Sequence, residues 1–314
     1  MTIKLNATCY YCCQNFSPSE RIRVHGLHLK CFKKWFNLPH QMNFMDLALR
    51  TQDKESHDPL HLSPFHTINM SSFQGKFKKY SATLNKNDYI LKVEQPEYPE
   101  LPATEYLCNE IASALKMKVP EYYLIQFENT LATFVVKNFM QAFPGGDLVH
   151  IYRYLKNPKD FNCQILIRII QEKTGKREDI IHFIQMCLFD SLIGNHDRHG
   201  RNLGLIQTNR GLSLAPIYDN PSYLAIEEDF LLDANHEPRG KISTQATEEP
   251  TMKDYIKEFK RLRYGSVVEN FIKQASSAYS DILNLIEQSF ISPKRKNSLK
   301  RLVTKRYKEM SNES

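Results

Sequence analysis

The chain has 314 residues, 41% of them hydrophobic, and a formal net charge of +7 at pH 7. This length and apolar content are enough for two lobes and a small additional module. The sequence has no run of eighteen apolar residues and no apolar leader, which argues against a membrane-spanning helix and a signal peptide. Its seven cysteines favour a reducing compartment over a disulfide framework, so we expect a cytoplasmic protein.

The N-terminal residues contain four potential metal ligands in two closely spaced pairs. Cys9 and Cys12 form the first pair, and His28 and Cys31 follow after an interval of fifteen residues. Thiolates and imidazole suit tetrahedral zinc, and protein atoms would fill all four positions. We therefore expect residues 1–37 to form a zinc-finger-like module with a structural ion. Reduced thiols beside an unbound histidine are the alternative.

A polar segment and then a run of short apolar stretches follow this module. Residues 38–66 are expected to be a linker, and residues 77–84 and 88–92 to be strands. The polar loop before the strands is a candidate for holding nucleotide phosphates, with Ser71, Ser72, Gln74 and Lys76 as its polar side chains.

A lysine and a glutamate follow this loop in the order that phosphoryl transfer uses. Lys92 lies in the second expected strand, and residues 101–115 form an expected helix with Glu105 on its first turns. A strand lysine held by a helix carboxylate can neutralise nucleotide phosphates. The alternative is that both are ordinary surface residues.

The most informative stretch is Gly194–Asn202, together with the aspartate that follows it. An expected helix over 178–193 precedes this loop, and an expected hairpin over 203–217 follows it. Asp197, Asn202 and Asp219 would then meet at one place, where they could orient a hydroxyl and hold magnesium against phosphates.

Two other interpretations of this loop were considered. It could cap a helix and pair charges without any chemistry. Its Gly-Asn-His-Asp sequence also occurs in two-metal phosphoesterases, which need further histidine and aspartate ligands. The nearest upstream candidate, Gly146–His150, misses that pattern, and only His236 remains downstream, so phosphoryl transfer is favoured.

The remaining chain is irregular over 233–251 and then helical over 251–310. Its last part is basic, with Lys294, Arg295, Lys296, Lys300, Arg301, Lys305, Arg306 and Lys308. Leu299, Leu302 and Val303 form an apolar stripe on the same segment, which predicts an amphipathic basic helix. Such a face is either simply solvated or attracts nucleic acid or an acidic protein.

From Ile68 to Tyr223 the sequence resembles the HipA/HipT-like serine/threonine kinases of bacterial toxin–antitoxin systems. Six matching pieces occur in the family's order: Ser71–Phe77, Tyr89–Lys92, Leu101–Tyr106, Lys118–Glu121, Ile193–Asn202 and Leu214–Asn220. The resemblance implies an α+β, two-lobed protein-kinase-like fold. A small β-containing N-lobe would span residues 67–141, and a mainly helical C-lobe residues 142–314.

The resemblance also implies roles for single residues. Lys92 would contact the phosphates of ATP and Glu105 would orient Lys92, with Asp197 as the catalytic aspartate. Asn202 and Asp219 would bind Mg²⁺ or Mn²⁺. His199 matches a family position in the catalytic loop. Asn138 and Phe139 fall in the stretch that corresponds to the adenine hinge, where they replace the family's usual residues.

The phosphate loop departs from the family pattern. Ser72 replaces a glycine that lets backbone N–H groups approach phosphates closely. Of two serines that the family can autophosphorylate, one corresponds to Asn69 and the other to Ser71. Self-modification is therefore expected at Ser71 only.

Substrates and partners follow only from the resemblance. They are ATP and a protein with an acceptor serine or threonine, for which the family precedent is the aminoacyl-tRNA synthetases. An antitoxin-like regulator, nucleic-acid contact through the basic helix, and bacterial export into a host cell stay open. The alternative function is a catalytically weak scaffold that acts as a zinc-finger binding module for protein or nucleic acid.

Overall fold

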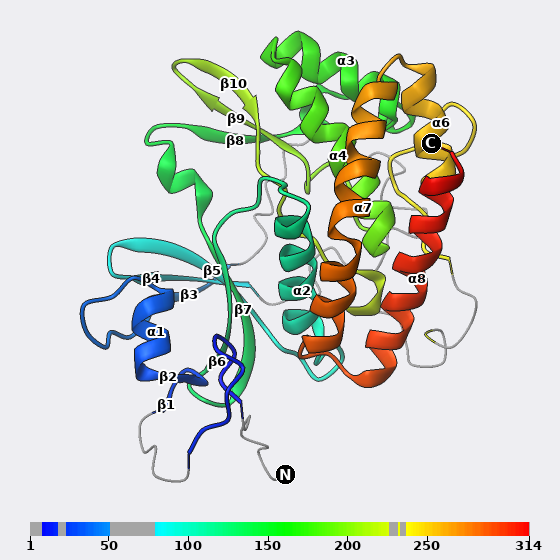
Figure 1. The fold of residues 1–314 in the computed structure, drawn as a ribbon. Helices are drawn as coiled ribbons and strands as arrows, with labels where there is room; N and C mark the ends of the chain where they lie inside the picture. Colours follow the sequence, from blue (N-terminus) through cyan, green and yellow to red (C-terminus); the bar gives the residue numbers. More distant parts are fainter. Residues whose placement is uncertain (1–7, 18–22, 51–78, 226–231, 233–236, 314) are drawn as a thin grey trace.

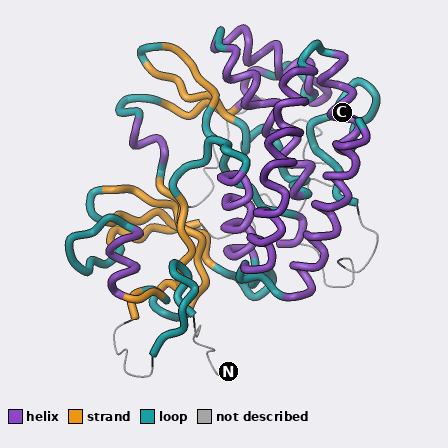
Figure 2. Tube along the Cα trace, viewed as in Figure 1, coloured by secondary structure: helices purple, strands orange, loops and turns teal. Residues whose placement is uncertain are grey.

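The computed structural model of the chain describes residues 8–17, 23–50, 79–225, 232 and 237–313. A five-stranded sheet forms one part of the molecule, a bundle of helices forms another, and a three-stranded sheet lies beside the bundle (Figure 1). Strands and helices are largely separated in space (Figure 2). The predicted α+β class with a β-containing lobe and a mainly helical lobe is confirmed.

All neighbouring strands in the two larger sheets are antiparallel. The five-stranded sheet has the order β3-β4-β5-β7-β6 and the three-stranded sheet the order β10-β9-β8. The first consists of Met45–Arg50 (β3), Lys79–Leu84 (β4), Asn87–Val93 (β5), Tyr122–Phe127 (β6) and Leu131–Lys137 (β7). The second consists of Asp147–His150 (β8), Gly204–Thr208 (β9) and Gly211–Leu214 (β10).

Seven α-helices occur in the described ranges. They are Leu29–Trp35 (α1), Leu101–Ala114 (α2), Cys163–Thr174 (α3), Arg177–Ile193 (α4), Met252–Arg261 (α6), Gly265–Gln288 (α7) and Pro293–Asn312 (α8). The expected helices over 101–115, 178–193 and 251–310 are thereby confirmed. None of the described helices is both long enough and apolar enough to cross a membrane.

The N-terminal module is a hairpin followed by a helix. Strands Arg23–Val24 (β1) and Leu27–His28 (β2) pair around His25 and Gly26, both of which have positive φ, as a tight hairpin turn requires. A Cβ on Gly26 would come within 2.6 Å of the Gln126 Cβ, so only glycine fits there. The Gln126 amide donates to the His25 carbonyl, which joins the turn to β6.

This module shares one hydrophobic core with the five-stranded sheet. Phe32, Phe36 and Leu27 belong to the same buried cluster as Tyr89 and Val135 of the sheet. The Phe36 and Tyr123 rings stack with their centroids 4.1 Å apart. The module is therefore built into the β-containing lobe rather than attached to it by a flexible connection.

The expected linker over 38–66 differs from the structure at one point, because β3 lies inside it. Met45–Arg50 pairs with β4 and forms an edge of the sheet. Met45, Leu47 and Leu49 of this strand are exposed. The alternating apolar residues of this short edge strand face solvent, and the strand stands directly before the polar residues 51–59, so the sequence indicated a linker.

Helix α2 connects the two lobes. It was expected to belong to the N-lobe, and it does contact β6 and β7, but its buried residues lie in the core of the helical lobe with α4 and α7. Figure 1 shows α2 running beside α7. The Ser292 amide donates to the Glu100 carboxylate at 2.6 Å, which ties the start of α2 to the start of α8.

Helix α4 ends directly at the loop of interest. Gly194 adopts φ +71° at its C-terminus, a conformation that side chains disfavour. A Cβ there would also lie within 2.8 Å of Pro238, Tyr223 and Leu302. The glycine therefore stops the helix and starts the loop at a fixed position.

The expected hairpin over 203–217 is shorter than predicted. Strand β10 ends at Leu214, and Pro216 has no N–H with which to continue the pairing. The Ile217 amide donates to the Lys118 carbonyl instead. Asp219 consequently lies in a loop with φ +52°, not at the end of a strand.

Candidate active site

Lys92 of β5 lies at the centre of a buried group of charges. Its Nζ donates to the Glu105 carboxylate of α2 and, at 2.5 Å, to Oδ1 of Asp219. The side chains of Lys92 and Glu105 are 6% and 2% exposed. Three residues from different parts of the sequence, which were predicted to act together, are thus brought into contact.

The opposite charges in this group shift the pKa values of Lys92 and Asp219. Burial alone would lower the pKa of Lys92, but Asp219 and Glu105 raise it above its ordinary value. Burial alone would raise the pKa of Asp219, but Lys79 and Lys92 hold it well below its usual range. At neutral pH the site therefore contains a fixed cation between two carboxylates.

Lys79, which the sequence did not single out, also contacts this group. Its Nζ lies 3.0 Å from Oδ2 of Asp219. Lys79 is the first residue of β4 and is directly paired with Lys92 across the sheet. A lysine at the start of a strand is normally an exposed surface residue. Only the pairing of Lys79 with Lys92 across the sheet could have indicated that it lies at this site.

A second residue that the sequence missed, Arg198, holds the Gly194–Asn202 loop against the Asp219 segment. Its Nε and Nη2 bind both carboxylate oxygens of Asp190 at 2.8 and 2.9 Å. Its Nη1 donates to the carbonyls of Asn202 and Tyr218 at 3.1 and 2.6 Å. The predicted metal-binding segments around residues 202 and 219 therefore meet at one guanidinium group.

Asn220 extends this network to α2. Its Oδ1 accepts from Arg198 Nη2 at 2.7 Å, and its Nδ2 donates to Asn109 Oδ1 at 3.2 Å. Asn109 in turn donates to the Glu105 carbonyl at 2.8 Å. All of these side chains are buried, so the network fixes the loop, the Asp219 segment and α2 relative to one another.

Within the loop, Asp197 and Asn202 are buried and directly linked. The Asn202 Nδ2 donates to the Asp197 carbonyl at 2.9 Å, which leaves the amide oxygen of Asn202 as its ligand atom. The Asp197 amide donates to Asn195 Oδ1 at 3.0 Å. Hard oxygen donors such as Asp219 and Asn202 suit Mg²⁺ or Mn²⁺, so the residues present fit the predicted ion.

His199 lies beside Asp197, with its Nε2 4.0 Å from Oδ2 of the aspartate. Burial lowers the pKa of His199 to about 4, so the ring is neutral at pH 7. Its Nδ1 accepts from the Arg201 amide at 3.1 Å, which places the ring proton on Nε2. The neutral ring therefore accepts a hydrogen bond within the loop and adds no positive charge beside Asp197.

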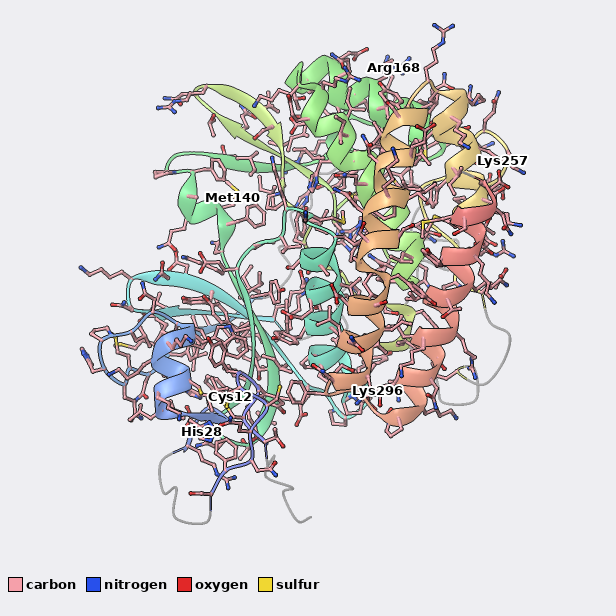
Figure 3. The ribbon with its side chains drawn as sticks, in the orientation of Figure 1. Cys12, His28, Met140, Arg168, Lys257 and Lys296 are labelled. Carbon is pink, nitrogen blue, oxygen red and sulfur yellow. The ribbon has the colours of Figure 1, made fainter. Side chains whose placement is uncertain are left out.

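The expected adenine hinge is the connection between β7 and β8. The side chain of Asn138 accepts from the Met140 amide at 3.2 Å and so begins a short 3₁₀ helix, Phe139–Ala142. The Phe139 ring lies 5.7 Å from the Tyr218 ring, next to Asp219. Figure 3 shows Met140 on this connection. Ser71, Ser72, Gln74 and Lys76 lie outside the described residues.

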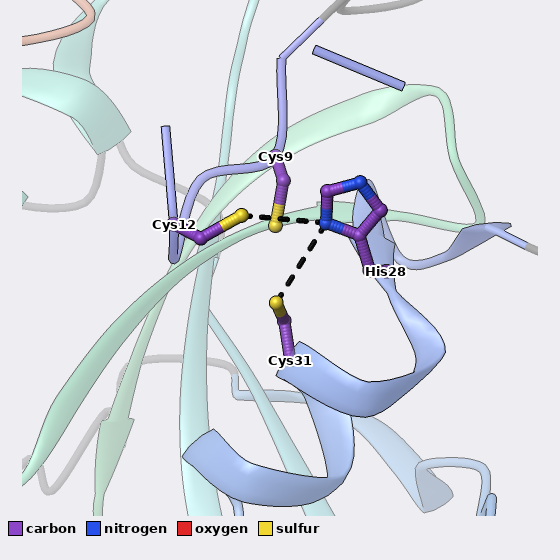
Figure 4. Close-up of side chains that lie close together, drawn as sticks. All are labelled: Cys9, Cys12, His28 and Cys31. Carbon is purple, nitrogen blue, oxygen red and sulfur yellow. Dashed lines mark hydrogen bonds between the residues drawn. The ribbon is translucent and has the colours of Figure 1, made fainter. Parts of the chain in front are cut away.

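The four predicted zinc ligands come together in the N-terminal module (Figure 4). The ligand atoms of Cys9, Cys12, His28 and Cys31 all lie within 4.8 Å of one another. The His28 Nδ1 is 3.4 Å from the Cys12 sulfur and 3.7 Å from the Cys31 sulfur. Metal–ligand bonds of about 2.0–2.3 Å in a tetrahedron separate ligand atoms by about this much. The cluster therefore fits a zinc ion.

The predicted basic helix is α8, but many of its cations have partners inside the protein. Arg295 binds the Leu224 carbonyl at 2.9 Å, and Arg306 is fully buried against the Pro238 carbonyl and Glu309. A groove over α8 keeps a basic lining, made by Lys253, Lys300, Arg301, Lys305 and Lys308. Within this lining Lys300 and Lys305 pair with Glu287 and Glu237, and Arg301 donates to the Leu232 carbonyl, so this face too has partners inside the protein.

Comparison with known proteins identifies the family. The model of the HipA-like C-terminal domain matches residues 71–288, more than half of the chain. The Sinorhizobium fredii protein named "Putative kinase Y4dM" is 26% identical over 149 residues, which cover 42% of this chain and 36% of that relative. The chain thus spans about a third of the length of that relative.

Two solved structures have a similar fold. The Helicobacter pylori proinflammatory kinase CtkA has a TM-score of 0.60 and 19% identity, and the match covers 74% of this chain and 90% of CtkA. The Shewanella oneidensis HipA structure, determined with HipB and operator DNA, has a TM-score of 0.56 and 16% identity, over 88% of this chain and 72% of that one. The chain belongs to the family of the HipA-like C-terminal domain, and its fold resembles those of CtkA and HipA.

Proposed function

We propose that the protein is an ATP- and Mg²⁺-dependent serine/threonine protein kinase. The observation that supports this most is the buried ion-paired group in which Lys92 joins Glu105 and Asp219. A cation held this rigidly would be ready to neutralise nucleotide phosphates without rearrangement. An ordinary surface salt bridge would not bury both Lys92 and Glu105, whose side chains are 6% and 2% exposed.

In this proposal each residue acts through position and charge. Asp197 orients the acceptor hydroxyl and takes its proton, while Lys92 binds the phosphates of ATP. Asn202 and Asp219 would hold the metal ion, which would supply positive charge against the phosphates. Arg198 keeps the two ligand-bearing segments together. Covalent chemistry by the protein is not needed.

Transfer of labelled phosphate tests this proposal. The purified chain is incubated with γ-labelled ATP and Mg²⁺, alone and with a cell lysate, beside the Asp197→Ala and Asp219→Ala variants. We expect label on the protein itself or on a lysate protein with wild type and none with either variant. Asp147→Ala, which removes an exposed aspartate of β8, is the control. Absence of transfer by folded wild type would refute the kinase proposal.

The phosphate loop is proposed to carry the site of self-modification. Ser71 is the residue expected to accept phosphate, and mapping of the labelled peptide tests this. Label elsewhere, or an unchanged pattern in Ser71→Ala, would reject Ser71 as the site while leaving the kinase proposal in place.

A catalytically weak scaffold is the second candidate. It is favoured by one feature, namely that both carboxylate oxygens of Asp219 are engaged by lysines. The HipA neighbour was determined with HipB and operator DNA, so a regulatory protein or nucleic acid is the partner class we propose for either function. A folded wild type that binds such a partner but transfers no label would favour the scaffold.

A further inference from the structure

Lys79 and Lys92 hold the two oxygens of one carboxylate. Asp219 Oδ1 is paired with Lys92 at 2.5 Å and Oδ2 with Lys79 at 3.0 Å. The two lysines are register partners on β4 and β5, so their side chains leave the sheet on the same face. A proposed metal ligand is thus covered by two ammonium groups in this structure.

The two lysines differ in how firmly they are held. The side chain of Lys92 is 6% exposed and has a second carboxylate partner in Glu105. The side chain of Lys79 is 36% exposed, and among the described residues Asp219 is its one ion-pair partner. Lys79 can therefore leave Asp219 at little cost, whereas Lys92 cannot.

Asp219 itself is held in place by its neighbours. The preceding carbonyl, that of Tyr218, and the following side chain, that of Asn220, both bind the buried guanidinium of Arg198. Movement of Lys79 is therefore the rearrangement that frees Oδ2 of Asp219 while this segment stays in place.

We propose that Lys79 is an exchangeable counter-ion of the site. Without ligand it occupies Oδ2 of Asp219 and competes with a divalent cation. When a nucleoside triphosphate arrives with its metal, the ammonium group moves from Asp219 to the phosphates. This rests on the proposed function, and it makes metal binding weak until the nucleotide is present.

Metal binding without nucleotide tests the first half of this proposal. Mn²⁺ is titrated into the full chain and followed by its paramagnetic resonance signal, for wild type, Lys79→Met, Lys79→Gln and the matched control Lys86→Met. Lys86 is an exposed residue of the turn between β4 and β5. We expect Mn²⁺ to bind about fivefold more tightly to both Lys79 variants, as the loss of a partly exposed ion pair predicts, and unchanged in the control.

Nucleotide binding tests the second half. In the presence of Mg²⁺ the Lys79 variants should bind ATP about fivefold more weakly than wild type, yet bind adenosine equally well. If Lys79 stayed paired with Asp219 permanently, its substitution would leave the affinity for ATP unchanged as well as the affinity for adenosine. Unchanged Mn²⁺ affinity in the Lys79 variants, or an equal loss for ATP and adenosine, would overturn the proposal.

The Asp219→Asn variant separates this inference from the function on which it rests. If it binds Mn²⁺ as well as wild type does, the ion is not held by Asp219 and both ideas fail. If Mn²⁺ binding depends on Asp219 and tightens without Lys79, but no labelled phosphate is transferred, the counter-ion role stands and the kinase proposal fails.

Discussion

The side chain of Arg198 makes five hydrogen bonds and is 1% exposed. In the sequence it is one of two arginines in a polar loop, where a solvated cation is the ordinary expectation. Its partners lie up to 22 positions away, at Asp190, Tyr218 and Asn220. No local pattern connects these residues, so this part of the site could be found only in three dimensions.

Removal of Arg198 should strongly destabilise the protein. Arg198→Met would leave the Asp190 carboxylate buried without its partner, and we expect the free energy of unfolding to fall by about 3–5 kcal/mol. Denaturant unfolding measures this. Arg168→Met is the control, because Arg168 is exposed on α3 (Figure 3) and should change stability by less than about 0.5 kcal/mol. Equal effects of the two variants would contradict the structural role of Arg198.

Two histidines with lowered pKa values should make stability depend on pH. Burial lowers the pKa values of His182 and His199 to about 4, from an ordinary value of 6.5. The unfolded chain therefore binds these protons more readily than the folded one. The stability that depends on these histidines staying neutral is fully present above about pH 6.5. It is lost as the pH falls toward 4, and the free energy of unfolding then decreases by about 3 kcal/mol for each histidine.

Denaturant unfolding between pH 5 and pH 8 checks this dependence. His182→Leu, which removes a buried ring of α4, should flatten the slope between pH 5 and pH 6.5, while His40→Leu at an exposed position is the control. A slope that His182→Leu leaves unchanged would show that other groups cause it.

Among the elements, α2 decides whether the charged group is assembled. It bears Glu105, it packs in the helical core, and Glu100 at its start accepts hydrogen bonds from Ser292 and Arg295. The helix and its glutamate were predicted from the sequence, because the apolar spacing of 101–115 is helical. Its attachment to α7 and α8 was not, since those contacts join residues almost 200 positions apart.

Glu105→Gln tests the positioning role of α2. The substitution keeps the shape but removes the charge that holds Lys92, so we expect kcat/KM for phosphate transfer to fall about 100-fold. Glu110→Gln, on the same helix, should have little effect on transfer. A fully active Glu105→Gln variant would mean that Lys92 does not need this partner.

The N-terminal module is a second element whose chemistry followed from the sequence. Its ligand spacing predicted the cluster, but its common core with the sheet depends on aromatic packing that no spacing indicates. Metal loss should therefore weaken the whole β-containing lobe. We expect one zinc ion per chain by metal analysis, and a melting temperature about 5–10 °C lower in Cys9→Ser or after chelation. Cys13→Ser, outside the cluster, is the control, and a zinc-free chain of unchanged stability would contradict this.

At the scale of the whole molecule, the candidate site lies where the two lobes are joined. The five-stranded sheet supplies Lys79 and Lys92, α2 supplies Glu105, and the loops after α4 and β10 supply the remaining polar groups. The resemblance to the HipA/HipT-like kinases implied a two-lobed fold. The sequence could not show that these segments contact one another at the site. It also could not show that many α8 cations pair inside the protein, which lowers the positive charge available to a partner.

If Asp197 orients the acceptor hydroxyl and takes its proton, phosphate transfer at this site depends on its carboxylate. The direct measurement is the rate of transfer from γ-labelled ATP under saturating Mg²⁺ and ATP, for Asp197→Asn beside the exposed control Asp147→Asn. We predict a fall of about 1,000-fold for Asp197→Asn with ATP affinity retained, and a wild-type rate for the control. A wild-type rate in Asp197→Asn would contradict the proposed role of Asp197 in phosphate transfer.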